Sequence, residues 1–240
     1  MTVSVDPARG GRWTSLRAGG REWLWSRPAE RCSVAPGDPF VDAGGIEECV
    51  PTVRGVPDHG AAWSRPWTGG VVDCGEFTLR RDLSIVDSSV VARYRLDAAP
   101  GFRFIWAAHA LLDLSASARL EAPAGTEVRL DGGAVAEWPD HLAALGPDDG
   151  TATGAILVDC PTVTVADGER LTFALDAPGQ PVSTALWRNL GGWPAPDPYR
   201  SIGVEPMLGR AWDLAEAAPD DAAVVPPTGI CEWRLTVRAQ

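Results

Sequence analysis

The stretch TVTVADGERLTFALDAPGQPVSTALWR, residues 162–188, alternates short β-rich segments with turn residues. The segments are 162–166, 170–176 and 183–188, and the turns between them are ADG at 166–168 and APG at 177–179. Valine, threonine, phenylalanine and tryptophan favour strands, whereas aspartate, glycine and proline favour turns. Strands at this spacing are typical of an all-β sandwich or barrel.

The same pattern extends over most of the chain. Further strand-like segments lie at 78–87, 89–97, 102–114, 117–122, 126–131, 155–159 and 230–238. Only 211–218 has a pattern that predicts one or two helical turns. The segment 132–154 is expected to be a long loop, and long loops in compact domains are often functional. No shift in composition and no internal repeat divides the chain, so we predict a single domain over residues 1–240.

Charge and composition exclude several classes of partner. The formal net charge is −11, from 21 basic and 32 acidic residues, and 45% of the residues are apolar. A chain this apolar folds into a globular core. The acidic balance argues against nucleic acid and anionic membranes, which are bound through a surplus of basic residues.

Cysteine usage and the N-terminus indicate a reducing compartment. Five cysteines, an odd number, are scattered without a CxxC pair; they are Cys32, Cys49, Cys74, Cys160 and Cys231. This spacing supports neither a zinc site nor a disulfide framework. MTVSVDPARGG lacks the apolar core of a signal peptide, and no apolar run is long enough for a membrane helix. We therefore expect a soluble cytoplasmic protein with reduced thiols.

Sequence motifs for nucleotide binding, zinc hydrolysis and the serine nucleophile elbow are missing. The remaining polar candidates include three histidines. His59 lies in a loop with Trp63 and Trp67 nearby, and it is either a solvated loop residue or a functional one. His141 is interpreted as a surface residue without a role.

His109 lies in the apolar run FRFIWAAHALLDL, residues 102–114. Strand alternation assigns Phe102, Phe104, Trp106, Ala108, Ala110 and Leu112 to one face, which we predict to be core. His109 shares the other face with Arg103 and Asp113, so that face can line a polar cavity. The alternative is a core histidine that is hydrogen-bonded to the backbone.

Glu205 stands in GVEPML, between Val204 and Pro206. The residue before proline is held extended, and proline offers no donor to a sheet, so Glu205 is expected at a strand end or bulge. Apolar neighbours raise the pKa of a carboxyl toward neutrality, where a general base works best. The alternative is a structural carboxylate that caps a buried amide or pairs with Arg200 or Arg210.

Several segments, in this order, resemble the galactose mutarotase (aldose 1-epimerase) superfamily, and most of all its hexose-phosphate mutarotase branch. The opening GGRWTSLRAGGREWLW resembles the first strand pair, and GGIEECVP resembles the Gly-Gly-Ile-Pro-x-Cys-x-Pro loop. The matching segments are 10–25, 44–51, 58–67 around His59, 203–217 around Glu205 and the final PPTGICEWRLTVR. His109 stands where the second family histidine is expected.

This resemblance implies a β-supersandwich of two large packed antiparallel sheets. It also implies interconversion of the α and β anomers of a free aldose without metal or organic cofactor. Carried over to this chain, Glu205 is the base at the anomeric hydroxyl, His109 is the acid at the ring oxygen, and His59 hydrogen-bonds the sugar. The expected partner is a monosaccharide, and the expected state is a monomer or homodimer.

Departures from the family pattern bear on the substrate. Trp63 stands where the hexose-phosphate branch has an arginine, and the Gly-Gly-Ile loop contains two glutamates, one of them Glu47. Phosphate is bound by arginine and lysine, so we predict a neutral or amino sugar. Trp63 or Trp138 is expected to stack on the ring, and Glu47 and Asp140 are the candidate substrate-binding carboxylates.

Two other functions compete with the mutarotase hypothesis. A noncatalytic carbohydrate-binding protein of the same fold is the alternative. The other is glycoside hydrolysis, which requires two carboxylates placed across a glycosidic bond. Glu205 is the one carboxylate whose sequence neighbours suit such a role, so hydrolysis is disfavoured.

Overall fold

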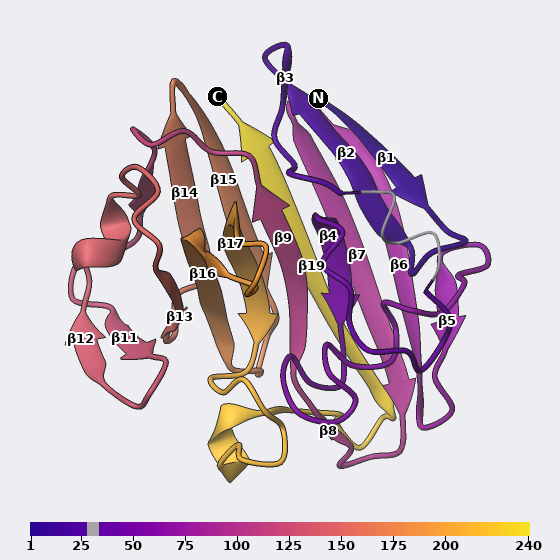
Figure 1. Ribbon diagram of the computed structural model, residues 1–240. Coiled ribbons are helices and arrows are strands. Elements are labelled where there is room, and N and C mark those ends of the chain that lie inside the picture. The colour runs from indigo at the N-terminus through magenta and orange to yellow at the C-terminus, as the bar shows by residue number, and fades with distance from the viewer. Residues whose placement is uncertain (28–33) are drawn as a thin grey trace.

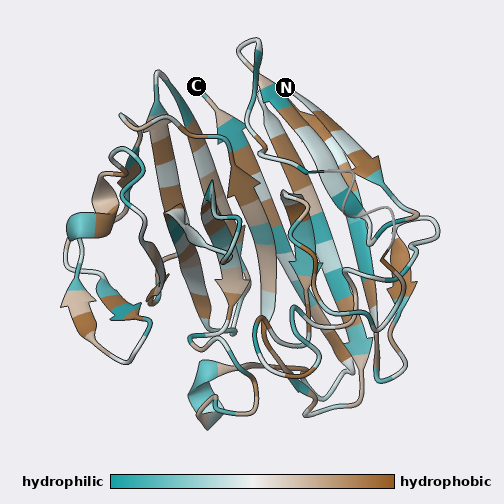
Figure 2. Ribbon diagram, viewed as in Figure 1, coloured by the Kyte–Doolittle hydropathy of each residue, from teal (hydrophilic) through white to brown (hydrophobic). Residues whose placement is uncertain are grey.

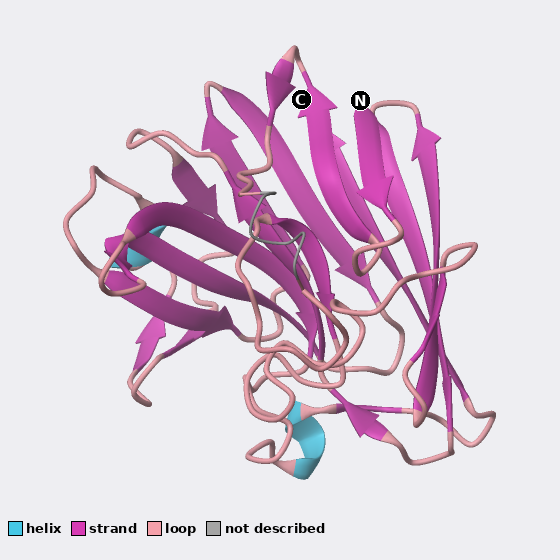
Figure 3. Ribbon diagram, turned by 45° about the vertical axis from the view of Figure 1, so that its right-hand side comes forward, coloured by secondary structure: helices cyan, strands magenta, loops and turns pink. Residues whose placement is uncertain are grey.

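Two antiparallel β-sheets pack face to face, as Figure 1 shows. The computed structural model describes residues 1–27 and 34–240, so Cys32 lies outside the described residues. The remaining cysteines are free thiols. The predicted all-β class, with large packed antiparallel sheets, is confirmed. Helical structure in the described residues is limited to two 3₁₀ turns, His141–Ala143 and Pro219–Asp221, coloured cyan in Figure 3.

The larger sheet has ten strands. Their order is β1 (Thr2–Asp6), β2 (Arg12–Ala18), β4 (Gly45–Cys49), β9 (Trp106–Leu112), β17 (Tyr199–Leu208), β16 (Val182–Trp193), β13 (Ala152–Leu157), β11 (Glu127–Leu130) and β12 (Val135–Glu137), with β3 (Arg21–Glu22) paired to β2. The central strands β4, β9 and β17 are neighbours although the chain segments that form them are far apart.

The smaller sheet has seven strands. Their order is β10 (Arg119–Glu121), β14 (Thr162–Asp167), β15 (Glu169–Asp176), β19 (Ile230–Ala239), β7 (Ser89–Ala98), β6 (Phe77–Val86) and β5 (Val71–Asp73). A separate pair joins β8 (Arg103–Phe104) to β18 (Ala223–Val224).

The main core fills the space between the two sheets. Apolar and polar residues alternate along the strands, which gives the brown and teal banding in Figure 2. Trp106 of β9 packs against Tyr94 of β7 and Trp233 of β19, with ring centroids 4.8 and 5.2 Å apart. The core face predicted for the run that contains His109 is confirmed, because Phe104, Trp106 and the even-numbered residues to 112 belong to this core.

Some local predictions were wrong at the level of elements. The run 102–114 is broken at Ile105 into β8 and β9. The expected helical segment 211–218 forms a turn at 214–216 and no helix. The expected long loop 132–154 contains β12 and a 3₁₀ turn, and its last residues begin β13.

The segment 44–51, expected as a loop, is mostly a buried strand. All five residues of β4 are buried, including two glutamates whose side chains point to opposite faces of the sheet. Glu48 faces the inter-sheet core and accepts hydrogen bonds from Arg81 Nη1 (2.6 Å), Tyr94 Oη (2.9 Å) and Trp106 Nε1 (2.8 Å). Its charge is therefore paired and satisfied inside the core.

Candidate active site

The face of the ten-stranded sheet that points away from the main core carries His109 and Glu205. β17 pairs with β9 through Gly203 opposite Leu111 and Met207 opposite Ala107, which places Glu205 across from His109. Their side chains approach to 3.8 Å between His109 Nε2 and Glu205 Oε1. His109 is 8% exposed and Glu205 is 1% exposed, so the pair is almost fully withdrawn from bulk water.

Glu205 lies inside β17 and not at the expected strand end. The pairing of β17 with β9 is interrupted between Gly203 and Met207, whereas the pairing with β16 continues through Ala185 opposite Glu205. Pro206 has no N–H to donate, which accounts for the interruption. The local irregularity inferred from the proline is thus present within the strand.

Gly203 makes room for the carboxylate. Strand residues two apart share a face, and a Cβ at position 203 would lie 2.4 Å from Glu205 Oε1 and 2.9 Å from Trp187 Cβ. The arginines weighed as partners of Glu205 bind elsewhere, since Arg200 donates to Asp148 and Arg210 donates to Asp159. The structural-carboxylate alternative therefore loses both of its named ion-pair partners.

Glu205 combines burial with incomplete hydrogen bonding. Its Oε2 atom is buried and accepts no hydrogen bond from any described residue. Burial raises the pKa of the Glu205 carboxyl, while the charges of His109 and Arg54 oppose that rise. A carboxyl in this environment holds a proton more strongly than a solvated one, which suits proton transfer near neutral pH.

His59 enters the same site from the loop that follows β4. Its backbone adopts a left-handed conformation with φ of 58°, and its N–H donates to the carbonyl of Val53 at 2.9 Å. The imidazole stacks on Phe40 with centroids 3.5 Å apart and meets the His109 ring edge-on at 5.0 Å. Burial lowers the pKa of His59, and Asp58 at 3.1 Å partly offsets this. The three residues assigned to catalysis by sequence therefore lie together.

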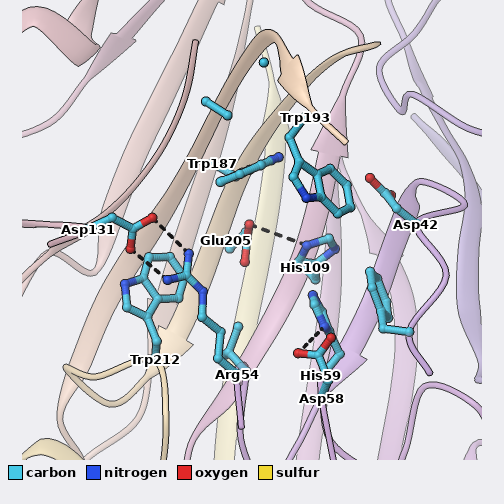
Figure 4. A pocket seen from close by; sticks show the side chains of 14 residues that line it. Asp42, Arg54, Asp58, His59, His109, Asp131, Trp187, Trp193, Glu205 and Trp212 are labelled. Atoms are coloured by element: carbon cyan, nitrogen blue, oxygen red, sulfur yellow. Dashed lines mark hydrogen bonds and ion pairs between the residues drawn. The ribbon is translucent and has the colours of Figure 1, made fainter. Parts of the chain in front are cut away.

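These side chains line a cavity of about 580 Å³. Figure 4 shows Glu205 between His109 on one side and the Arg54–Asp131 pair on the other. Arg54 donates to both carboxylate oxygens of Asp131, at 2.8 and 3.1 Å, and its guanidinium lies 4.3 Å over the ring of Trp212. Such a cavity is in the size range of small-molecule sites.

Gly154 permits this wall to form. A Cβ there would lie 2.4 Å from Asp131 Oδ2 and 2.9 Å from Arg54 Nη2, and the Gly154 N–H donates to Asp131 at 2.9 Å. The sequence analysis did not identify Arg54 or Asp131. They are separated by 77 residues, so no local motif connects them.

A second wall is aromatic and comes from the end of β16. The register of β16 with β17 shifts between Leu190 and Trp193. Buried Asn189 fixes this bulge by donating to the carbonyl of Trp193 at 2.8 Å and accepting from the N–H groups of Gly192 and Trp193 at 3.0 Å. The bulge presents Trp193, 43% exposed, beside Trp187 at the cavity.

The four predicted substrate-binding residues do not line this cavity. Trp63 is 1% exposed and packs edge-on against Phe40, one layer behind the wall. Glu47 is 2% exposed, with its Oε1 3.9 Å from Arg12 Nε. Trp138 belongs to the main core, and Asp140 caps the 3₁₀ turn at 141–143. The cavity is lined instead by Arg54, Asp131, Trp187 and Trp193.

The described part of the chain offers no group of three or more His, Cys, Asp and Glu side chains arranged to hold a metal ion. Within the same residues, no helix has the length and apolar character needed to span a membrane.

Comparisons with known proteins agree with this architecture. No family model and no curated protein sequence matches the chain. Among solved structures, the Slr1438 protein of Synechocystis sp. PCC 6803 has a TM-score of 0.76 at 16% identity, covering 99% of this chain and 91% of the other. A candidate aldose 1-epimerase of Escherichia coli K12 has a TM-score of 0.74 at 14% identity, covering 99% and 95%.

A galactose mutarotase related enzyme from Lactobacillus acidophilus is similar over the same extent. Its TM-score is 0.69 at 14% identity, and the match covers 99% of this chain and 94% of that one. The chain has the galactose mutarotase-like fold. The mutarotase-like fold expected from the ordered sequence segments is thereby confirmed, while identities this low say nothing of activity.

Proposed function

We propose that this protein is a cofactor-independent aldose 1-epimerase that acts on a free, non-phosphorylated sugar. The observation that carries the proposal is the buried His109–Glu205 pair at 3.8 Å, with His59 beside it, in a cavity of sugar size. Anomer exchange requires one group that accepts a proton from the C1 hydroxyl and one that donates a proton to the ring oxygen. The pair supplies both groups.

In the proposed reaction, Glu205 takes the proton of the C1 hydroxyl while protonated His109 gives its proton to the ring oxygen. The bond between C1 and the ring oxygen breaks, and C1 becomes the aldehyde carbon. Rotation about the C1–C2 bond presents the other face of the aldehyde. Reclosure returns the proton from the former ring hydroxyl to His109 and the proton from Glu205 to the C1 oxygen, so the enzyme ends as it began.

Burial supports this division of roles. The raised pKa of Glu205 makes its carboxylate a stronger base than a solvated one. His59 has a lowered pKa and so is neutral at physiological pH, which allows it to hydrogen-bond sugar oxygens without competing as the acid. The Arg54–Asp131 pair and the tryptophan wall would hold the ring between them.

Anomer exchange measured by NMR saturation transfer between α and β signals tests the proposal. The panel comprises glucose, galactose, fucose, rhamnose, a uronic acid and glucose 6-phosphate. We expect faster exchange for at least one uncharged sugar, lost in Glu205→Gln and in His109→Asn. Ligand-induced shifts without faster exchange would contradict catalysis and identify a carbohydrate-binding protein, and a Glu205→Gln protein as fast as wild type would refute Glu205 as the base.

A further inference from the structure

The cavity is unusually acidic for a site that would bind an anionic sugar. Its lining includes four carboxylates, those of Asp42, Asp58, Asp131 and Glu205, and one guanidinium. That guanidinium, Arg54, is engaged at both terminal nitrogens by Asp131. Among the described lining residues, no arginine or lysine is therefore left uncommitted to bind a phosphate or carboxylate group.

Asp42 is the carboxylate whose setting needs explanation. It is 9% exposed, and among the described residues it forms no ion pair. Its Oδ2 accepts from the Tyr199 hydroxyl at 2.5 Å and its Oδ1 accepts from the Gly44 N–H at 3.2 Å. Two neutral donors leave acceptor capacity unused on an ionised carboxylate. A nearly buried carboxylate without a cation is costly, and a cationic ligand would remove that cost.

The surroundings of Asp42 favour a cation further. Asp42 and Trp193 both line the cavity (Figure 4), and Tyr199 connects them, because its hydroxyl donates to Asp42 and its ring lies edge-on to that of Trp193 with centroids 6.0 Å apart. Tryptophan faces attract ammonium groups, and Trp193 is held in place by the bulge that Asn189 fixes. Glu205, which also lines the cavity, adds a second sign of a missing donor, because its Oε2 is buried and accepts no hydrogen bond from the described residues.

We infer that the site selects a cationic amino sugar, with the sugar ammonium held by Asp42 against Trp193. This inference rests on the proposed function for the location of the sugar, and it adds the substrate class and the residue that selects it. The ammonium would donate to the free lone pairs of Asp42, and the apolar face of the ring would rest on the tryptophan wall. The same charges would repel glucose 6-phosphate and uronic acids.

Calorimetric titration of the full chain with matched sugars tests the inference. The probes are 2-amino-2-deoxyglucose and 6-amino-6-deoxyglucose, each compared with its N-acetyl derivative, with glucose and with glucose 6-phosphate, at a pH where the amine is protonated. We expect at least one amine to bind about tenfold or more tightly than its N-acetyl form, the size of one charge-assisted hydrogen bond. Added salt should weaken the amine and leave glucose unchanged.

Two variants assign the effect to its residue. Asp42→Asn keeps the shape and removes the charge, so the preference for the amine should disappear. Asp87→Asn makes the same change of net charge in the exposed turn between β6 and β7, and the preference should remain. Equal binding of amine and N-acetyl forms by wild type, or a preference that survives Asp42→Asn, would overturn the inference.

The same samples separate this inference from the proposed function. Faster anomer exchange of glucose without any preference for amines would retain the epimerase and refute the cation subsite. Tight, Asp42-dependent binding of an amine without faster exchange of any sugar would retain the subsite and refute catalysis.

Discussion

Replacing Gly203 with alanine should disable the site without replacing a reacting group. The added Cβ would lie 2.4 Å from Glu205 Oε1, and an ordinary contact begins at 3.4 Å. Pairing with β16 fixes the backbone of β17, so the Glu205 carboxylate must move instead. It must move by about 1 Å to restore an ordinary contact distance. A misplacement of about 1 Å in a reacting group can cost about 100-fold in rate, which is about 2.7 kcal/mol in the barrier.

The assay is anomer exchange by saturation transfer on the best sugar of the panel. Thermal unfolding and near-ultraviolet circular dichroism of the same sample report whether the fold is retained. Gly179→Ala is the control for loss of a glycine away from the cavity, since a Cβ there would meet nothing within 4 Å; its φ of 75° adds backbone strain, so we expect this control to lose some stability but to keep the wild-type rate. A folded Gly203→Ala protein with the wild-type rate would refute the argument that this glycine positions the carboxylate.

Three further predictions follow from buried groups. Glu205→Gln should be more stable than wild type at neutral pH and lose that advantage in acid, as measured by denaturant unfolding at several pH values. The reason is that the pKa of the Glu205 carboxyl is raised in the folded state. Its protonation therefore stabilises the wild-type fold fully below the pKa of the unfolded carboxyl, and this stabilisation is lost as pH rises through the folded pKa. Glu48→Gln should destabilise the fold by about 3–5 kcal/mol in the same measurement, because Arg81 would remain buried without its carboxylate; a loss below 1 kcal/mol would contradict this. Phe40→Ala should raise the pKa of His59 toward its ordinary value by admitting water to the stacked ring, as followed by NMR titration of the imidazole, and an unchanged titration would show that Phe40 does not shield it.

Strand alternation carried much of the prediction from sequence. Period-two patterning placed Trp106 in the core and His109 on the opposite face without knowledge of the partner strands. Pro206 correctly signalled a local defect in pairing, although the strand continues past it. These features depend on neighbours within a few residues, which a single sequence displays directly.

The cavity walls could not be read from sequence because they are made by distant segments. Arg54 lies in a loop after β4, and Asp131 follows β11, so only the folded sheet brings them together. Trp193 reaches the cavity through a bulge whose determinant, Asn189, acts through hydrogen bonds to backbone groups. Trp63 shows the reverse error, since its position close to His59 in sequence did not reveal that its ring is buried in packed structure.

Two buried glutamates of one sheet show how the fold distinguishes a structural carboxylate from the one that we propose to be reactive. Glu48 faces the space between the sheets, where Arg81 neutralises its charge and three donors satisfy its oxygens. Glu205 faces the cavity, where its Oε1 has only a histidine at 3.8 Å and its Oε2 accepts no hydrogen bond from the described residues. Burial alone is common to both, so burial does not mark function. What distinguishes Glu205 is its unmet hydrogen-bonding capacity. A substrate hydroxyl can donate a hydrogen bond to this carboxylate and then transfer its proton to it.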